Sequence, residues 1–235
     1  MTPEQIPLLI GFIVMSLGSV AIFLHGDKRR EFRHHTQFHS VVPFIAATAY
    51  LAMTLGTGVI AIGDTTIYFP RYIDWSVTTP ILLAGLILTG LHEHPRHSTY
   101  ILPAIVLDVI MIATGLVAAL SDDPTQKLIW FAWSCAAFAG VLYILWKPVC
   151  DVSDDLGGGM KTVYRANLIF LTVVWLIYPV AFAIGPEWLG MISGVGSLWL
   201  ILVLDVTAKV VYGFVATARF KKLPDGTPEQ TRRYG

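Results

Sequence analysis

Five ionisable side chains lie within long apolar stretches of the sequence: Arg71, Asp74, Asp108, Asp205 and Lys209. A charged side chain at the centre of a bilayer costs about 3 kcal/mol on insertion scales, so each of the five is a candidate for a function. Asp205 and Lys209 are four residues apart, which places both on one face of a helix and close enough to pair. The spacing therefore predicts a buried cation with a carboxylate beside it.

The Asp205–Lys209 pair has two interpretations. It could be a structural salt bridge between helices, although buried ion pairs often stabilise little compared with apolar pairs. Alternatively, a lysine in a dry pocket reacts readily with aldehydes to form a Schiff base, which would make an aldehyde pigment the natural cofactor. Asp74 lies three residues after Arg71 and four before Thr78, on roughly one helix face. Asp74 is therefore available as a second carboxylate for the same cation.

Membrane-spanning helices are the elements expected to position these residues. The chain has 235 residues, of which 55% are hydrophobic and 14% charged, and its mean hydropathy is +0.65. Seven apolar segments approach the roughly 20 residues that span a bilayer, and they run approximately over 7–25, 38–62, 71–91, 99–120, 127–147, 163–185 and 192–219. We expect an all-α membrane protein, a seven-transmembrane-helix bundle that crosses the lipid bilayer of the cell (inner) membrane several times.

Basic residues near the segment ends predict the orientation. One side carries Lys28, Arg29, Arg30, Arg33, Arg96, Lys147, Lys161, Arg165, Arg219, Lys221 and Lys222, whereas Lys127 stands alone on the other. The positive-inside rule then places the N-terminus outside and the C-terminus in the cytoplasm. The start, MTPEQIPLLI, lacks the basic residues of a signal peptide. We expect one seven-helix domain over 1–222 and a short flexible cytoplasmic tail over 223–235.

Other classes of function have little support in the composition. Sixteen basic residues balance sixteen acidic ones, and no basic, aromatic-interleaved patch suggests nucleic acid. Cys135 lies in an apolar run and Cys150 in a polar connection, so they are interpreted as unrelated thiols rather than a disulfide framework. No metal site is expected.

Three motifs carry a resemblance to a known family. They are Arg71-Tyr72-x-Asp74-Trp75-x-x-Thr78-Thr79-Pro80, Trp175-x-x-Tyr178-Pro179, and Leu204-Asp205-Val206-Thr207-Ala208-Lys209. With these motifs the chain resembles the microbial rhodopsins from the second predicted helix to the seventh. The resemblance implies that Lys209 carries all-trans retinal as a protonated Schiff base, with Asp74 and Asp205 as paired counterions.

The resemblance also implies which side chains enclose the retinal. They are Tyr50, Trp75, Thr79, Leu82, Met111, Gly115, Trp130, Phe131, Ser134, Trp175, Tyr178 and Phe182, with Trp130 and Phe131 at the ring end. Asp108 matches a position where a protonated acid hydrogen-bonds to the third helix, here through Thr79. Phe131 occupies the place of a glycine window in antenna-carrying relatives, so we expect no carotenoid antenna. Family members form trimers or pentamers, and a homo-oligomer is expected.

Among rhodopsin functions, the motifs favour an outward proton pump, an ion transporter rather than an enzyme, with protons and internal water as its partners. Asp74 and Thr78 match neither the chloride-pump nor the sodium-pump pattern, and Ala208 replaces the threonine of sensory members that signal through a transducer. A photosensor remains the alternative. A pigment-free receptor or transporter is a third possibility, and it would need Lys209 to be a structural ion pair only.

The predicted proton path has an unusual cytoplasmic side. The donor position, which is a carboxylic acid in the best-known pumps, is Gly85 here. We expect water in its place and His39 as a possible relay, because imidazole titrates near neutrality. The alternative is that His39 anchors the helix end at the headgroups, as other histidines at that face do. On the outer side, Glu187 matches one member of the release pair, but its partner position is Ser197, so Glu187 is either a release group or an ordinary loop acid.

Overall fold

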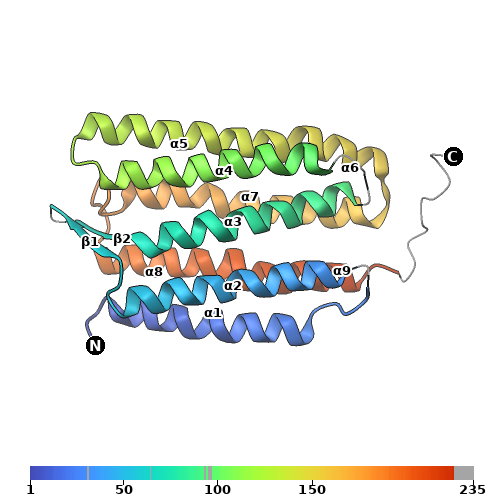
Figure 1. Ribbon diagram of the computed structural model, residues 1–235, viewed down its shortest axis with the longest axis horizontal. Coiled ribbons are helices and arrows are strands. Elements are labelled where there is room, and N and C mark those ends of the chain that lie inside the picture. The colour runs from blue at the N-terminus through green and yellow to red at the C-terminus, as the bar shows by residue number, and fades with distance from the viewer. Residues whose placement is uncertain (31, 64, 93, 95–96, 225–235) are drawn as a thin grey trace.

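Seven helical rods make up the part of the chain that the computed structural model describes, which is residues 1–30, 32–63, 65–92, 94 and 97–224 (Figure 1). The rods are α1 (Gln5–His25), α2 (Arg33–Thr54), α3 (Phe69–Leu91), α4 (His97–Leu120), α5 (Pro124–Ile144) with η1 (Leu145–Val149) and α6 (Cys150–Leu156), α7 (Gly158–Ile184), and α8 (Gly194–Asp205) with η2 (Val206–Val211) and α9 (Tyr212–Lys221). The predicted seven-helix membrane bundle is confirmed. Most of the predicted tail over 223–235 lies outside the described residues.

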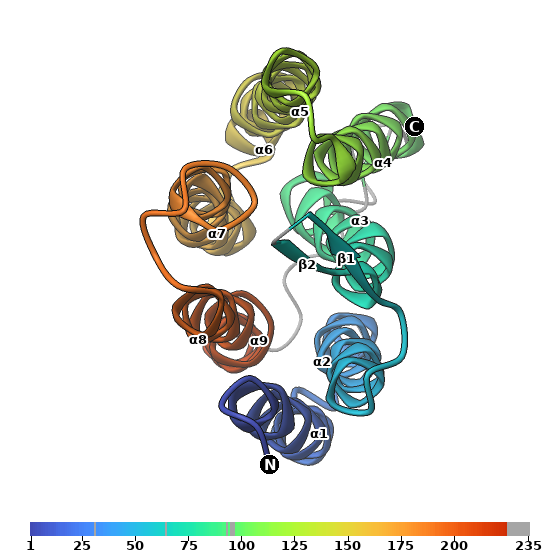
Figure 2. The same ribbon diagram turned by 90° about the vertical axis from the view of Figure 1, so that its left-hand side faces the viewer.

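The rods form a ring in chain order, as a view along the bundle shows (Figure 2). The last rod returns to the first, because α1 packs against α8 and η2, while α3 also packs against α7 across the ring. One end of the bundle carries a β-hairpin and is called the hairpin end. The opposite end carries the α1–α2 and α3–α4 connections and several histidines, and is called the histidine end (Figure 1).

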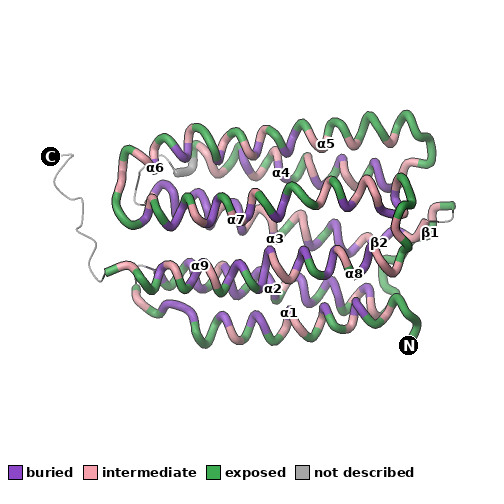
Figure 3. Tube along the Cα trace, turned by 180° about the vertical axis from the view of Figure 1, so that it is seen from behind, coloured by how far each residue is buried: buried purple, intermediate pink, exposed green. Residues whose placement is uncertain are grey.

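The exterior of the bundle is apolar. Large hydrophobic side chains are exposed along most rods, while the buried positions face the interior (Figure 3). Among the described residues, six helices are long and apolar enough to cross a membrane. The exception, α2, begins with the polar run RHHTQFHS, of which four side chains are nevertheless buried. The first two turns of α2 therefore bury polar side chains inside the bundle.

The segment predicted as a helix over 38–62 is wrong at both ends. The helix begins earlier, at Arg33, and ends at Thr54, and it is followed by Gly56 and Gly58, whose φ angles are +73° and +69°. Left-handed glycines end a helix because other residues adopt that conformation at a cost. Beyond them, β1 (Val59–Ile62) pairs antiparallel with β2 (Thr65–Tyr68), with Ile62 opposite Thr65. The residues 59–62 are apolar, but they form a hairpin rather than a membrane span.

The fifth rod is also longer than predicted. The sequence suggested a polar connection over 151–159, but the helix continues through a π-helical turn that contains Pro148 and ends only at Leu156. Cys150 is consequently buried in a helix rather than placed in a loop. Gly157 and Gly158, with φ angles of +68° and +71°, make the turn into α7.

Candidate functional site

Lys209 lies at the centre of the bundle between two carboxylates. Its side chain is 2% exposed, and its Nζ donates a hydrogen bond to Asp74 Oδ2 and lies 3.3 Å from Asp205 Oδ1. Asp74 comes from α3 and Asp205 from the end of α8. Lys209 itself is part of η2, a π-helical turn, and such turns are frequent at functional sites. The structure therefore brings together the cation and both carboxylates that the spacing predicted.

The two carboxylates are hydrogen-bonded very differently. Asp205 accepts hydrogen bonds from Tyr50 Oη at 2.9 Å, Tyr178 Oη at 2.8 Å and Trp75 Nε1 at 3.2 Å. Asp74 Oδ1, by contrast, accepts no hydrogen bond from any residue that the structure describes. The hydroxyl of Thr78 donates to the backbone carbonyl of Asp74 at 2.8 Å rather than to its carboxylate. Apart from Lys209, the described residues thus provide more hydrogen-bond donors for a negative charge on Asp205 than for one on Asp74.

Arg71 and Glu187 form a second charged group, nearer the hairpin end. Arg71 Nη1 lies 3.8 Å from Glu187 Oε1, and both side chains are less than 10% exposed. The guanidinium also lies over the rings of Tyr68 and Trp75, at 5.4 and 6.0 Å from their centroids. The second carboxylate oxygen, Glu187 Oε2, has no partner in the described part of the chain. Glu187 is therefore a buried acid rather than an exposed loop residue.

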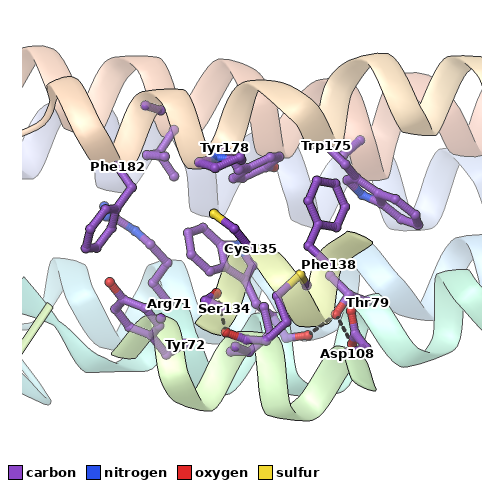
Figure 4. A pocket seen from close by; sticks show the side chains of 18 of the residues that line it. Arg71, Tyr72, Thr79, Asp108, Ser134, Cys135, Phe138, Trp175, Tyr178 and Phe182 are labelled. Carbon is purple, nitrogen blue, oxygen red and sulfur yellow. Dashed lines mark hydrogen bonds between the residues drawn. The ribbon is translucent and has the colours of Figure 1, made fainter. Parts of the chain in front are cut away.

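A largely apolar cavity extends from Lys209 between α3, α4, α5 and α7 (Figure 4). Its aromatic walls include Trp75, Phe131, Trp175, Tyr178 and Phe182. All the retinal-enclosing residues that the resemblance implied line this cavity, with the exception of two. Tyr50 instead contacts the back of Asp205. Trp130 is absent from the lining and 37% exposed, because it precedes Phe131 and so points about 100° away around the helix.

The cavity has further walls that the sequence reasoning missed. Cys135 and Phe138 from α5 point into it, and Tyr72 closes it beside Arg71 (Figure 4). A helical stripe could have indicated the α5 residues, since Phe131, Ser134 and Phe138 recur at intervals of three and four. Ser134 is anchored by a 2.8 Å hydrogen bond from its hydroxyl to the backbone carbonyl of Met111.

Asp108 and Thr79 connect α4 to α3 in the cavity wall. Their side-chain oxygens are 2.5 Å apart, and Thr79 Oγ1 also lies 2.7 Å from the backbone carbonyl of Trp75. A threonine hydroxyl has one proton and can donate to one acceptor. Both contacts are satisfied when Thr79 donates to the Trp75 carbonyl and a protonated Asp108 donates to Thr79.

The residues present fit an elongated apolar aldehyde. The reactive amine is buried at one point of a cavity whose walls are mostly aromatic and aliphatic, and two carboxylates are placed to balance a cation on the lysine nitrogen. Apolar pockets with a few convergent polar groups are typical of cofactor sites. Among the described residues, no group of three or more acidic, histidine or cysteine side chains could hold a metal ion.

Gly85 and His39 do not line the cavity and lie between it and the histidine end. A Cβ atom added to Gly85 would meet only Phe38, at 3.7 Å. His39 is 4% exposed, and its ring lies edge-on to Tyr212 with 5.2 Å between centroids. A Cβ added to Gly213 would lie 3.4 Å from the His39 carbonyl oxygen. His39 thus packs beside Gly213 of α9, which follows Lys209 by four residues in the sequence.

Fold and site together define a class of protein: a seven-helix membrane protein with a buried lysine at an aromatic cavity. The chain matches the model of the family "Bacteriorhodopsin-like protein" over residues 2–223. It is 35% identical to archaerhodopsin-2 from Halobacterium sp. (strain aus-2), over 91% of this chain and 83% of that protein. The chain therefore belongs to the bacteriorhodopsin-like family of microbial type 1 rhodopsins, multi-pass membrane proteins with a retinal chromophore.

Solved structures of rhodopsins share the fold. The thermophilic rhodopsin from Rubrobacter xylanophilus has a TM-score of 0.87 and 34% identity, covering 93% of this chain and 96% of that one. The light-driven proton pump Coccomyxa subellipsoidea rhodopsin has a TM-score of 0.83 and 28% identity, covering 93% and 97%. The relatives thus include a protein described as a proton pump.

Proposed function

We propose that this protein is a light-driven outward proton pump that carries all-trans retinal on Lys209. The observation that carries the proposal is the unequal hydrogen bonding of the two carboxylates beside that lysine. Asp205 is stabilised by three donors, whereas one oxygen of Asp74 has none among the described residues. A site in which one carboxylate stays ionised and the other can be protonated is suited to accept a proton from the lysine nitrogen on one side only.

When bound through Lys209, retinal supplies a light-driven change of shape that moves the proton-bearing nitrogen of the lysine. The proton then passes to Asp74, because neutralising the poorly stabilised carboxylate costs less than neutralising Asp205. Thr78 lies one turn along α3, and rotation of its hydroxyl would allow it to hydrogen-bond the neutral acid. Asp205 stays ionised and keeps Tyr50 and Tyr178 in place.

Proton release to the outside involves Arg71 and Glu187. Loss of the negative charge on Asp74 weakens the attraction of Arg71 toward the cavity and favours its contact with Glu187. Glu187 Oε2 has no partner among the described residues, which supports a role as release group. Since the partner position is Ser197, a proton shared between two carboxylates is not part of the proposal.

The lysine nitrogen regains its proton from the histidine end. The loose packing at Gly85, where an added Cβ would meet only Phe38 at 3.7 Å, and the buried position of His39 support a path through water and imidazole. Lys147, Lys161, Arg165, Arg219 and Lys221 lie at this end and Lys127 at the other, which by the positive-inside rule supports a cytoplasmic histidine end. We further propose a homo-oligomer without a carotenoid antenna, a retinal-binding domain over 1–222 and a tail over 223–235.

Illumination of retinal-supplied cells in unbuffered medium tests the proposal. We expect acidification of the medium that a protonophore abolishes. Asp74→Asn removes the acceptor, so the coloured variant should give no acidification, while Asp122→Asn, an exposed acid outside the site, should pump normally. Pumping by Asp74→Asn at the wild-type rate would contradict the acceptor role. A light-responsive protein that leaves the pH unchanged would favour the photosensor.

A further inference from the structure

A second buried histidine precedes His39 on the same face of α2. His35 is 1% exposed and His39 is 4% exposed, and the two are four residues apart, so their side chains are neighbours on the helix. In each ring Nδ1 has no hydrogen-bond partner among the described residues. We propose that His35 is the relay residue that passes cytoplasmic protons to His39, an inference that rests on the pumping function proposed above.

The outer connection of His35 is to His34. The two ring centroids are 4.1 Å apart, and His34 is exposed while His35 is buried. A proton collected from solvent by His34 thus needs to cross only a short distance to enter the bundle. The inner connection is to His39, which packs beside Gly213 four residues from Lys209. The three imidazoles therefore form a row from the surface toward the lysine.

The surroundings of His35 argue against a purely structural role. Its ring stacks on Phe220 at 4.3 Å, and Phe220 stacks in turn on Phe32. A phenylalanine at position 35 would serve that packing equally well. A buried Nδ1 that has no hydrogen-bond partner among the described residues is unfavourable, and packing alone does not explain it.

Among the residues that the structure describes, no acidic side chain acts on His35. The titratable groups that act on it electrostatically are His34 and His39 on α2 and His92 at the end of α3. On α9, Arg219 donates to Asn167 and Lys221 to the backbone carbonyl of His25. In the α1–α2 connection, Asp27 is paired with Arg29. Within the described part of the chain, no carboxylate therefore holds a proton on His35.

The transfer balances as a pair of hops. His35 accepts a proton on one ring nitrogen and gives the proton of its other nitrogen, through water, to His39. His39 likewise gives its proton, through water, to the lysine nitrogen. Each imidazole ends with the charge it began with, and one proton has moved from the cytoplasm to Lys209.

Flash experiments on the retinal-loaded protein in vesicles test the relay. We compare wild type with His35→Phe, which keeps the stack on Phe220, His39→Gln, the double variant, and His25→Gln as control, since His25 lies at the same end but bonds its own helix. The return of the visible absorption band should be at least about tenfold slower in His35→Phe. This is a smaller effect than the loss of a general acid or base usually has, because water can replace the imidazole in part. Its rate should then depend more steeply on pH, and azide should restore it.

A readout that does not involve pumping is the exchange of the His39 ring proton with water, followed by ¹⁵N NMR in protein without retinal. His35→Phe should slow that exchange. In the flash experiment, the visible absorption band of the double variant should return no more slowly than that of His39→Gln alone. If the absorption band returns slowly in His39→Gln, but His35→Phe matches wild type both in this return and in the exchange of the His39 ring proton, the relay through His35 is wrong while the proposed pumping stands. If the absorption band of His39→Gln returns as fast as that of wild type, neither histidine is a relay. An absence of pumping by the wild-type protein would refute both proposals.

Discussion

At the scale of single residues, environment rather than residue type separates the three buried aspartates of the membrane-spanning helices, Asp74, Asp108 and Asp205. Among the described residues, Asp205 has three side-chain donors besides the lysine, Asp74 has the lysine alone, and Asp108 has a threonine that already donates elsewhere. Hydrogen bonds to the charged form of an acid stabilise it, and their absence favours the neutral form. Three aspartates in one protein can therefore serve as permanent anion, proton acceptor and neutral structural acid.

Asp108 provides a prediction at this scale. In Asp108→Asn the amide can donate to Thr79 as the protonated acid does, so thermal stability should change little. Asp108→Leu loses the hydrogen bond, which is worth about 1 kcal/mol. The infrared band of a protonated carboxyl should disappear in Asp108→Asn. Equal destabilisation by asparagine and leucine, or an unchanged infrared band, would show that the acid is not held neutral by Thr79.

At the scale of elements, α3 carries two glycines with opposite surroundings. A Cβ at Gly90 would lie 2.8 Å from Tyr164 Cδ2 and 2.9 Å from Val149 Cγ1. At Gly85 the nearest atom is 3.7 Å away. Gly90 is thus required by the close approach of α7 and η1, whereas packing does not require Gly85. A glycine that packing does not need is consistent with a functional reason for the gap.

The two glycines give a matched pair of alanine variants. Gly90→Ala should lower the thermal stability of the protein by roughly 1–3 kcal/mol, because the added methyl group overpacks the interface. Gly85→Ala should be neutral or stabilising by up to about 1 kcal/mol, since alanine favours helix. Melting curves of the purified variants followed by circular dichroism provide the measurement. A larger loss for Gly85→Ala than for Gly90→Ala would contradict the packing described for α3.

At the scale of the whole molecule, a polar clamp formed by Asp27 and Arg29 joins the α1–α2 connection to the end of the last helix. Arg29, in the α1–α2 connection, donates to the backbone carbonyls of Phe220 and Leu223 at 2.6 and 2.7 Å. Asp27 holds the guanidinium with both carboxylate oxygens. These bonds satisfy carbonyls at the end of the last helix, which otherwise lack partners. The ring of seven rods is thereby closed at the histidine end.

The clamp predicts a pH dependence of stability. Burial raises the pKa of the Asp27 carboxyl, but the hydrogen bonds from Arg29 outweigh burial and bring the pKa below its usual value of 3.8. A lowered folded-state pKa contributes stability that is present above the unfolded-state pKa and lost as the pH falls through the folded-state pKa. Asp27→Asn should therefore reduce stability by roughly 1 kcal/mol at neutral pH.

The difference between Asp27→Asn and wild type should shrink once the pH falls below the ordinary carboxyl range. Thermal loss of the visible band, scanned at one fixed rate because membrane-protein unfolding is often irreversible, provides the measurement. Asp122→Asn, an exposed acid at the hairpin end, should show no difference at any pH. A difference for Asp27→Asn that persists unchanged in acid would exclude a charge effect.

Much of the fold was predictable because it depends on local composition. Apolar length gives the seven rods, and glycine and proline mark their connections. The hairpin at 59–68 was not predicted because its first strand is as apolar as a membrane helix. The extension of the fifth rod to Leu156 was missed because polar residues usually indicate a loop, whereas here Asp154 pairs with Arg165 on α7 and supports a helix.

The sequence by itself predicted a buried lysine with two carboxylates, because helical spacing places residues on one face of a helix, and its resemblance to the microbial rhodopsins predicted most of the cavity wall. Only the tertiary structure decided which carboxylate has more hydrogen-bond donors, since the donors to Asp205 come from three other helices, α2, α3 and α7. It also decided that Glu187 is buried against Arg71, that Trp130 faces outward, and that His35 and His39 are buried with no hydrogen-bond partner for Nδ1 among the described residues. Hydrogen bonding and burial depend on neighbours distant in the chain, and no local pattern contains them.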